Sequence, residues 1–243
     1  MSPWKRWMMG TATWLTEILP AVGTASSVSA VDAALPKLMT EHLETALAMS
    51  AAPQHVGDGA TIYLLRRGGY VLHRRGSNHF TCFVVRTVAR FDVQSPDTLI
   101  PICFDEEGTR TIAPIHFDTA RYREQGMSMA EIRTMISEGF ENGGYAPPAR
   151  TGISYMISPV LNLPDGKGGV WNYPPHFMIY ASHVTNEEVD ATPDRGEGWL
   201  PWINNVGPHG MIIVPVGQTE RERIRSDHRD LLQEVDKFLQ TQN

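Results

Sequence analysis

The chain has 243 residues, of which 42% are hydrophobic and 20% are charged, and its formal net charge is −6. This length and composition are typical of a globular protein with one sizeable core, so we expect a single domain. A mildly acidic chain without a basic stripe predicts no nucleic-acid partner. No apolar run approaches the roughly 18 residues that a membrane span requires, so we expect no span.

The first 30 residues have the layout of a secretory signal peptide. A basic pair precedes an apolar stretch, and small residues follow up to Ala30. Glu17 interrupts the apolar stretch, which leaves an amphipathic first helix of a cytosolic protein as the alternative. We expect export to the periplasm or the extracellular space, with residues 31–243 as the mature α+β domain.

The next part of the chain predicts one helix and a group of strands. Residues 36–50 place apolar side chains on one stripe, which is typical of an amphipathic helix. Residues 60–73 have the pattern of a hairpin, and residues 79–87 and 98–104 have that of two further strands. Because the connections are too short for crossover helices, we expect an antiparallel meander over 60–104.

The two cysteines of the chain lie in the last two of these strands. Cys82 and Cys103 are 21 positions apart in the sequence. Neighbouring antiparallel strands bring two Cα atoms within disulfide range, and an exported protein meets an oxidising compartment. We therefore predict a disulfide between them, with two buried free thiols as the alternative.

The middle of the chain is predicted to be helical. Ser128 and Glu131 form a capping-box pattern, and the apolar residues behind them keep helical spacing. A shorter helix is expected around residues 117–125. The acidic triplet at 105–107 is interpreted as a solvated turn at the end of a strand.

Strands return in the last third of the sequence. Short apolar runs at 152–158, 176–182 and 211–216 predict three strands separated by long linkers. A C-terminal helix is predicted over residues 219–240. The expected fold class is α+β, with an antiparallel sheet flanked by N-terminal, middle and C-terminal helices.

Several of these segments resemble a known group of sequences. In chain order they are GSNHFTCFV, PICFDEEG, GISYMIS, PPHFMIYA and GPHGMIIVPV. They are similar to a group of exported bacterial proteins of unknown function. The motifs of that group are, in chain order, Gly-Ser/Thr-Asn followed by Cys, then Pro-x-Cys, Gly-Ile-x-Tyr-Met, Pro-His-x-Met and Ile-Val-Pro-Val. The resemblance covers about residues 50–216 and departs at His79, where a Gly is expected. It implies export and the cysteine pair, and it implies no activity.

The sequence Pro-His-x-Met-Ile occurs twice, at His176 and at His209. If the two apolar runs lie side by side, both imidazoles would face one rim of the sheet. Together with a carboxylate they would form a site for a divalent metal, and His183 is a further candidate ligand. The alternative is that each imidazole caps a strand end or hydrogen-bonds to a backbone carbonyl.

Three tryptophans lie in the expected long loops. Trp171, Trp199 and Trp202 would form an apolar wall for a ligand, or they would pin the loops to the body of the domain.

Three hypotheses about function follow, and no catalytic residue is assigned. The favoured one is an extracytoplasmic protein that binds a small molecule or a metal. The second is a metal-dependent hydrolase-type enzyme that uses His176 and His209. The third is an envelope-associated structural or interaction protein.

Overall fold

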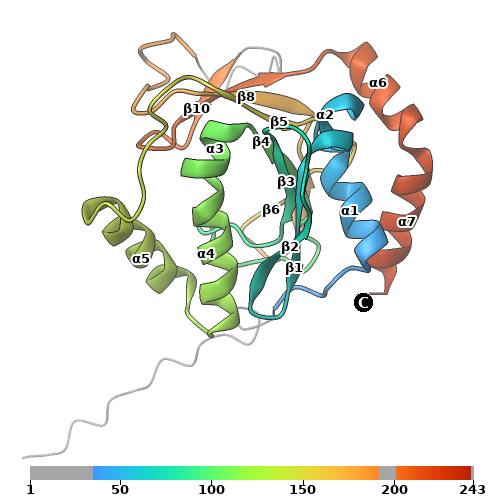
Figure 1. Ribbon diagram of the computed structural model, residues 1–243, viewed down its shortest axis with the longest axis horizontal. Coiled ribbons are helices and arrows are strands. Elements are labelled where there is room, and N and C mark those ends of the chain that lie inside the picture. The colour runs from blue at the N-terminus through green and yellow to red at the C-terminus, as the bar shows by residue number, and fades with distance from the viewer. Residues whose placement is uncertain (1–34, 192–200, 242–243) are drawn as a thin grey trace, which may run out of the picture.

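The computed structural model describes residues 35–191 and 201–241, so the predicted signal peptide lies outside the described residues. The α+β prediction is confirmed: a mixed, mostly antiparallel sheet of eight strands lies between two layers of helices (Figure 1). No helix in the described part of the chain is long and apolar enough to cross a membrane.

The large sheet has the strand order β2-β1-β3-β4-β5-β8-β10-β9. Its strands are β1 (Thr61–Arg66), β2 (Gly69–Arg74), β3 (Thr81–Val85), β4 (Ile100–Phe104), β5 (Ile153–Met156), β8 (His176–Tyr180), β9 (Trp202–Asn204) and β10 (Met211–Pro215). A separate hairpin consists of β6 (Asn162–Pro164) and β7 (Val170–Asn172).

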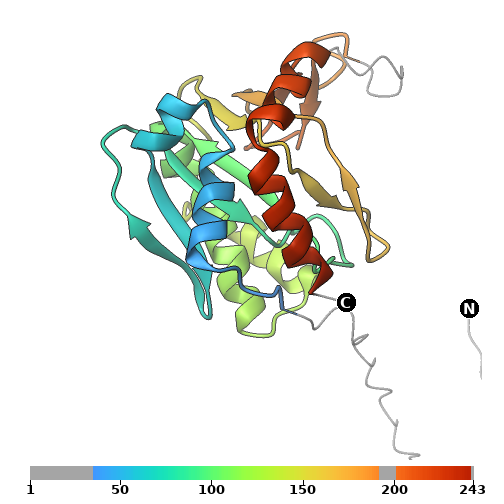
Figure 2. The same cartoon turned by 90° about the vertical axis from the view of Figure 1, so that its right-hand side faces the viewer.

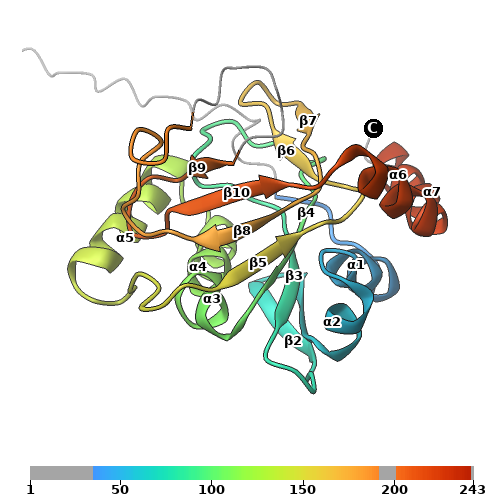
Figure 3. The same ribbon diagram turned by 90° about the horizontal axis from the view of Figure 1, so that it is seen from above.

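The helices form one layer on each face of the sheet. They are α1 (Glu41–Met49), α2 (Gln54–Gly59), α3 (Glu106–Thr111), α4 (Ala113–Glu124), α5 (Met129–Glu141), α6 (Gln218–Asp227) and α7 (Arg229–Gln240). Figure 2 shows α1, α2, α6 and α7 in front of the sheet, and Figure 3 shows α3, α4 and α5 on the other side. The first and last helices of the described residues thus share one layer, whereas the middle helices form the other.

Two apolar cores lie on the two faces of the sheet. Successive side chains of a strand point to opposite faces, so β3 contributes Val84 to the core under α1 and α7 and Phe83 to the core under α4. All five residues of β3 are buried, as are all five of β4. These two strands are therefore the centre of the domain, which explains their continuous apolar sequence.

The predicted antiparallel meander is wrong in one connection. β3 pairs with β1 in parallel, at Thr61–Thr81 and Ile62–Cys82, which leaves β2 at the edge of the sheet. The segment between β2 and β3 crosses the start of β1, where Gly76 fits closely: a Cβ atom there would lie 2.4 Å from the Gly59 carbonyl oxygen. A short loop with a glycine at the crossing thus replaces the crossover helix that parallel strands usually need.

The predicted disulfide is present. Cys82 and Cys103 oppose each other in the antiparallel register of β3 and β4, with their Cα atoms 4.1 Å apart. Both residues are fully buried, and neither cysteine of the chain is a free thiol. The bond links the two central strands.

The structure also corrects the prediction for the acidic triplet. The acidic triplet is not a solvated turn, because Asp105 caps α3 by accepting from the Gly108 N–H, at 2.9 Å, and Glu107 is buried. Glu107 accepts from the Ala149 N–H at 2.6 Å, and this bond is the main reason that its pKa is lowered. The two long linkers contain the β6–β7 hairpin and β9.

Candidate functional site

The repeated histidines lie at opposite ends of a strand pair. β8 and β10 are neighbours as expected, but they are antiparallel, and His176 pairs with Pro215 while Tyr180 pairs with Met211. A strand advances about 3.3 Å per residue, so the paired stretch from Met211 to Pro215 alone spans about 13 Å. His209 lies beyond Met211, and the structure therefore does not bring the two imidazoles to one rim.

His176 has a structural environment. Its side chain is buried, its Nδ1 lies 2.8 Å from the carbonyl oxygen of Pro174, and its ring packs edge-on against Tyr173 at 4.9 Å. A carbonyl only accepts, so Nδ1 carries the proton and the ring is the neutral tautomer. Burial lowers the pKa of His176 to about 4. The residue thus fits the alternative in which an imidazole bonds to a backbone carbonyl.

The third candidate ligand, His183, is an exposed residue with φ 63°. Its backbone N–H donates to the Gly207 carbonyl at 2.7 Å, which holds the end of β8 against the loop before β10. Among the described residues, no group of three or more His, Cys, Asp or Glu side chains is placed to hold a metal ion.

Two of the three predicted tryptophans meet around one tyrosine. The ring of Tyr173 lies edge-on to Trp171 at 4.6 Å and to Trp202 at 6.0 Å. Trp171 is 43% exposed, whereas Trp202 is half-buried against the core under α4. The contacts fit tryptophans that pin the β6–β7 hairpin and β9 to the body, and Trp199 lies outside the described residues.

An apolar cavity of about 400 Å³ lies between the sheet and helices α4 and α5. Its wall includes Ile102, Ile136, Phe140, Met156, Met178 and Met211. The loop between β9 and β10 closes one side of it, with Asn205 and Gly207 in left-handed conformations at φ 57° and 141°. A cavity of this size and composition is typical of small-molecule sites.

Two histidines, His116 and His209, line this cavity. His116 lies on α4 between the rings of Phe83 and Phe104, at 5.8 and 5.9 Å. Burial, with a smaller electrostatic contribution from His209, lowers the pKa of His116 to about 4. None of the described residues hydrogen-bonds to the nitrogens of the His116 ring.

His209 is held in place by α5 and by the loop that follows it. Its Nε2 donates to the Ala146 carbonyl at 3.1 Å, and its ring packs edge-on against Phe140 at 4.8 Å. Burial lowers the pKa of His209 as well. The cavity therefore holds two neutral imidazoles at neutral pH, and each offers a ring nitrogen that can accept a hydrogen bond.

Two arginines also line the cavity. Arg133 on α5 pairs with Asp92 at 2.6 Å, so its charge is compensated. Arg90 is exposed and donates to the Asn204 side chain at 2.9 Å, and no carboxylate among the described residues pairs with it. This arrangement favours an anionic or polar group over a cationic one near Arg90.

Sequence reasoning found His209 and missed His116. His116 is a single polar residue within a helical segment, and no spacing in the sequence relates it to His209. The predicted helix begins at residue 117, so nothing in the sequence places His116 on a helix or toward a cavity.

Comparisons of the chain with family models, with curated proteins and with solved structures find no match in any of the three.

Proposed function

We propose that this is an exported binding protein whose ligand is a small, mostly apolar molecule held in the cavity between the sheet and helices α4 and α5. The observation that carries the proposal is the His116 ring, which lines an apolar cavity and finds no hydrogen-bond partner among the described residues. The ring is half-buried, so a ligand that fills the cavity covers its nitrogens, and a ligand group that hydrogen-bonds to them avoids leaving them unpaired.

The residues that line the cavity under α4 and α5 indicate which chemical class of ligand fits it. The apolar side chains favour rings or a short hydrocarbon chain, because their burial is the main source of affinity. His116 is neutral at pH 7 and offers one donor and one acceptor, which suits a hydroxyl or carbonyl group. An unionised polar group is also easier to transfer into an apolar site than a charged one.

The test uses two fluorescent aromatic probes of the same shape, 1-naphthol and 1-methylnaphthalene, titrated into the protein. The wild type should bind both and should prefer the naphthol. His116→Phe keeps a ring of similar size without nitrogens, so it should lose this preference. The ratio of the naphthol affinity to the methylnaphthalene affinity should fall about tenfold. An unchanged preference in the variant would contradict the role of His116.

A second pair of variants tests the cavity itself. Ile136→Trp fills the space from α5, and Ser137→Trp places the same side chain on the exposed side of the same helix. Naphthol binding should be lost in the first variant and kept in the second. Equal binding by both variants would place the ligand elsewhere.

Export is supported by the layout of residues 1–30, by the resemblance to exported bacterial proteins and by the Cys82–Cys103 disulfide. Expression of the full chain in a bacterial host, with fractionation and intact-mass measurement, tests it. We expect a processed periplasmic form that begins close to residue 31. An unprocessed chain in the cytosol would contradict export.

The metal-dependent enzyme is not the function that we propose. His176 and His209 lie at opposite ends of β8 and β10, and His176 is already bonded to the Pro174 carbonyl. Metal content of the purified protein, beside that of His176→Ala/His209→Ala, tests this choice. Stoichiometric zinc, copper or iron that is lost in the double variant would restore the metal hypothesis.

A further inference from the structure

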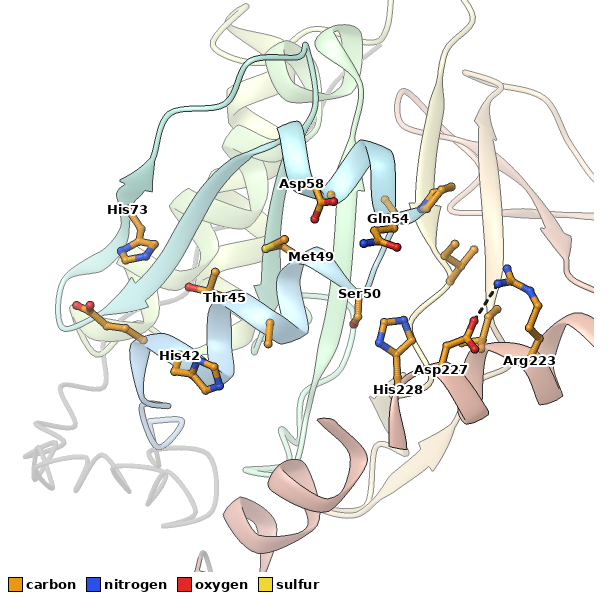
Figure 4. A pocket seen from close by; sticks show the side chains of 17 residues that line it. His42, Thr45, Met49, Ser50, Gln54, Asp58, His73, Arg223, Asp227 and His228 are labelled. Atoms are coloured by element: carbon orange, nitrogen blue, oxygen red, sulfur yellow. Dashed lines mark hydrogen bonds and ion pairs between the residues drawn. The ribbon is translucent and has the colours of Figure 1, made fainter. Parts of the chain in front are cut away.

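A second, larger cleft of about 800 Å³ lies on the other side of the sheet, in the layer that contains both ends of the described chain. One wall is formed by α1, α2 and β2, and the other by α6 and the start of α7 (Figure 4). No residue that lines this cleft also lines the apolar cavity under α4 and α5. The two spaces are therefore separate sites that can be tested independently.

Small and apolar side chains form part of the lining of this cleft. They are Ala46, Met49, Ala52, Pro53, Ile157 and Ile224. Because two of them are alanines, α1 and the turn after it leave room for a ligand. Such a surface takes up a short hydrocarbon chain or a ring, at a gain of about 0.8 kcal/mol per buried methylene.

The charged groups of the cleft are mostly carboxylates. Glu41, Asp58 and Asp227 line it, and Arg223 is the one lysine or arginine among the lining residues, so with histidines counted as neutral the wall carries −2. Two of the carboxylates have partners: Asp227 lies 2.9 Å from Arg223, and Glu41 lies 3.6 Å from Arg66.

Asp58 is the exception among these carboxylates. No cation or hydrogen-bond donor among the described residues pairs with its side chain. Figure 4 shows Asp58 and Met49 on the α1–α2 wall, across from Asp227 and His228. Asp58 is thus an exposed carboxylate without a partner among the described residues, beside a floor at which the Met49 sulfur accepts from Arg74 at 3.6 Å and the Gly57 carbonyl accepts from the same guanidinium at 2.8 Å.

Imidazole rings complete the wall of the cleft. His42, His73 and His228 come from α1, β2 and the junction of α6 with α7. Burial lowers the pKa of His228, which keeps this ring neutral at pH 7. A neutral imidazole accepts a hydrogen bond from an ammonium group and does not repel it.

We propose that this cleft binds a small organic cation: an ammonium group pairs with Asp58 while an attached hydrocarbon part covers the floor around Met49. Opposite charges attract, and a primary ammonium has three donors, enough to bond to Asp58 and to water at once. The acidic wall disfavours an anion of the same shape.

Isothermal titration with n-hexylammonium, n-hexanol and n-hexanoate tests the charge preference, because the three probes share one chain. The wild type should bind hexylammonium up to about fivefold more tightly than hexanol, the range of an exposed ion pair, and hexanoate the least tightly in this cleft. Propylammonium should bind more weakly, by up to about fourfold for each methylene removed. Equal affinities for the ammonium and the alcohol would overturn the proposal.

Asp58→Asn should weaken hexylammonium binding to the level of hexanol binding, a loss of up to about fivefold, and leave hexanol binding unchanged. Asp236→Asn removes an exposed carboxylate of α7 that does not line the cleft, and it should behave as the wild type. Ile136→Trp, which fills the other cavity, should also leave hexylammonium binding intact. Failure of Asp58→Asn to weaken binding would overturn the proposal, whatever the result for the other cavity.

Discussion

Glu44 on α1 and Arg66 at the end of β1 form an ion pair at 2.8 Å, in which the carboxylate is buried and the guanidinium is partly exposed. The same carboxylate accepts the Leu65 N–H at 2.6 Å. The parallel pairing of β1 with β3 ends at Ile62, so β3 offers no partner to this N–H. Glu44 therefore takes the place of a strand neighbour and ties α1 to the sheet.

Glu44→Ala should lower the free energy of unfolding by about 2 kcal/mol, because it leaves the buried Leu65 N–H without a partner and removes the closer of the two carboxylates that pair with Arg66. Glu44→Gln should cost less, since its amide oxygen can still accept the Leu65 N–H. Urea unfolding followed by circular dichroism measures both. Glu41→Ala, at an exposed partner of the same arginine, is the control and should change stability by less than about 0.5 kcal/mol.

The disulfide should contribute about 3 kcal/mol to the free energy of unfolding, as expected for a crosslink that closes a loop of this length. Unfolding of the wild type in guanidinium with and without reductant measures the crosslink alone. Cys82→Ala/Cys103→Ala adds the loss of two buried sulfurs and should be less stable still. A midpoint that does not depend on reductant would contradict the prediction.

Stability should fall as the pH decreases from about 6.5 to about 4, because His176 is neutral in the fold. Its pKa is about 4 in the folded protein and about 6.5 in the unfolded chain, so over this range the unfolded state binds more protons. The full effect is on the order of 3 kcal/mol, complete below about pH 4.

His176→Asn keeps a donor for the Pro174 carbonyl and removes one titration, so it should reduce this slope, while His116, whose pKa is also about 4, keeps its own contribution. His42→Asn, at an 82% exposed side chain, is the control and should keep the wild-type slope. Chemical unfolding at a series of pH values provides the measurement. An identical slope in His176→Asn and the wild type would show that other groups cause the pH dependence.

Thr45→Val should raise the free energy of unfolding by about 1 kcal/mol. The Thr45 hydroxyl is buried and has no hydrogen-bond partner among the described residues, and valine replaces it with a methyl group of the same shape. Thr134→Val on α5 is a matched control, because that hydroxyl is exposed and donates to the Ala130 carbonyl at 3.2 Å. Thermal unfolding of both variants tests the difference, and a destabilised Thr45→Val would contradict it.

Local features of the fold could be predicted from the sequence. The capping box at Ser128 and Glu131 is present, with the Ser128 N–H donating to the Glu131 carboxylate at 2.8 Å, and α5 begins directly after Ser128. The strands around Cys82 and Cys103 are adjacent and antiparallel, as their composition and spacing predicted. Caps, helical periodicity and apolar runs act over a few residues, so a single sequence contains them completely.

Predictions failed where they depended on strand order and direction. The sequence shows that a turn follows β2. It does not show that this segment crosses β1 and lets β3 pair with β1 in parallel, because that depends on the close approach of Gly76 to Gly59. Likewise, the repeat at His176 and His209 identifies two similar strands and does not give their relative direction. Both outcomes depend on contacts between segments far apart in the chain.

The α+β class, most of the helices and strands, and the disulfide could be predicted from the sequence, because they follow from local patterns and from the position of each cysteine in its strand. Which histidines share a cavity depended on the packing of the whole domain. The antiparallel pairing of β8 with β10 carries His176 away from His209, and the packing of α4 on the sheet brings His116 to the same cavity as His209. The physical reason is that a side chain's neighbours depend on strand direction and on layer packing, which no short stretch of sequence encodes.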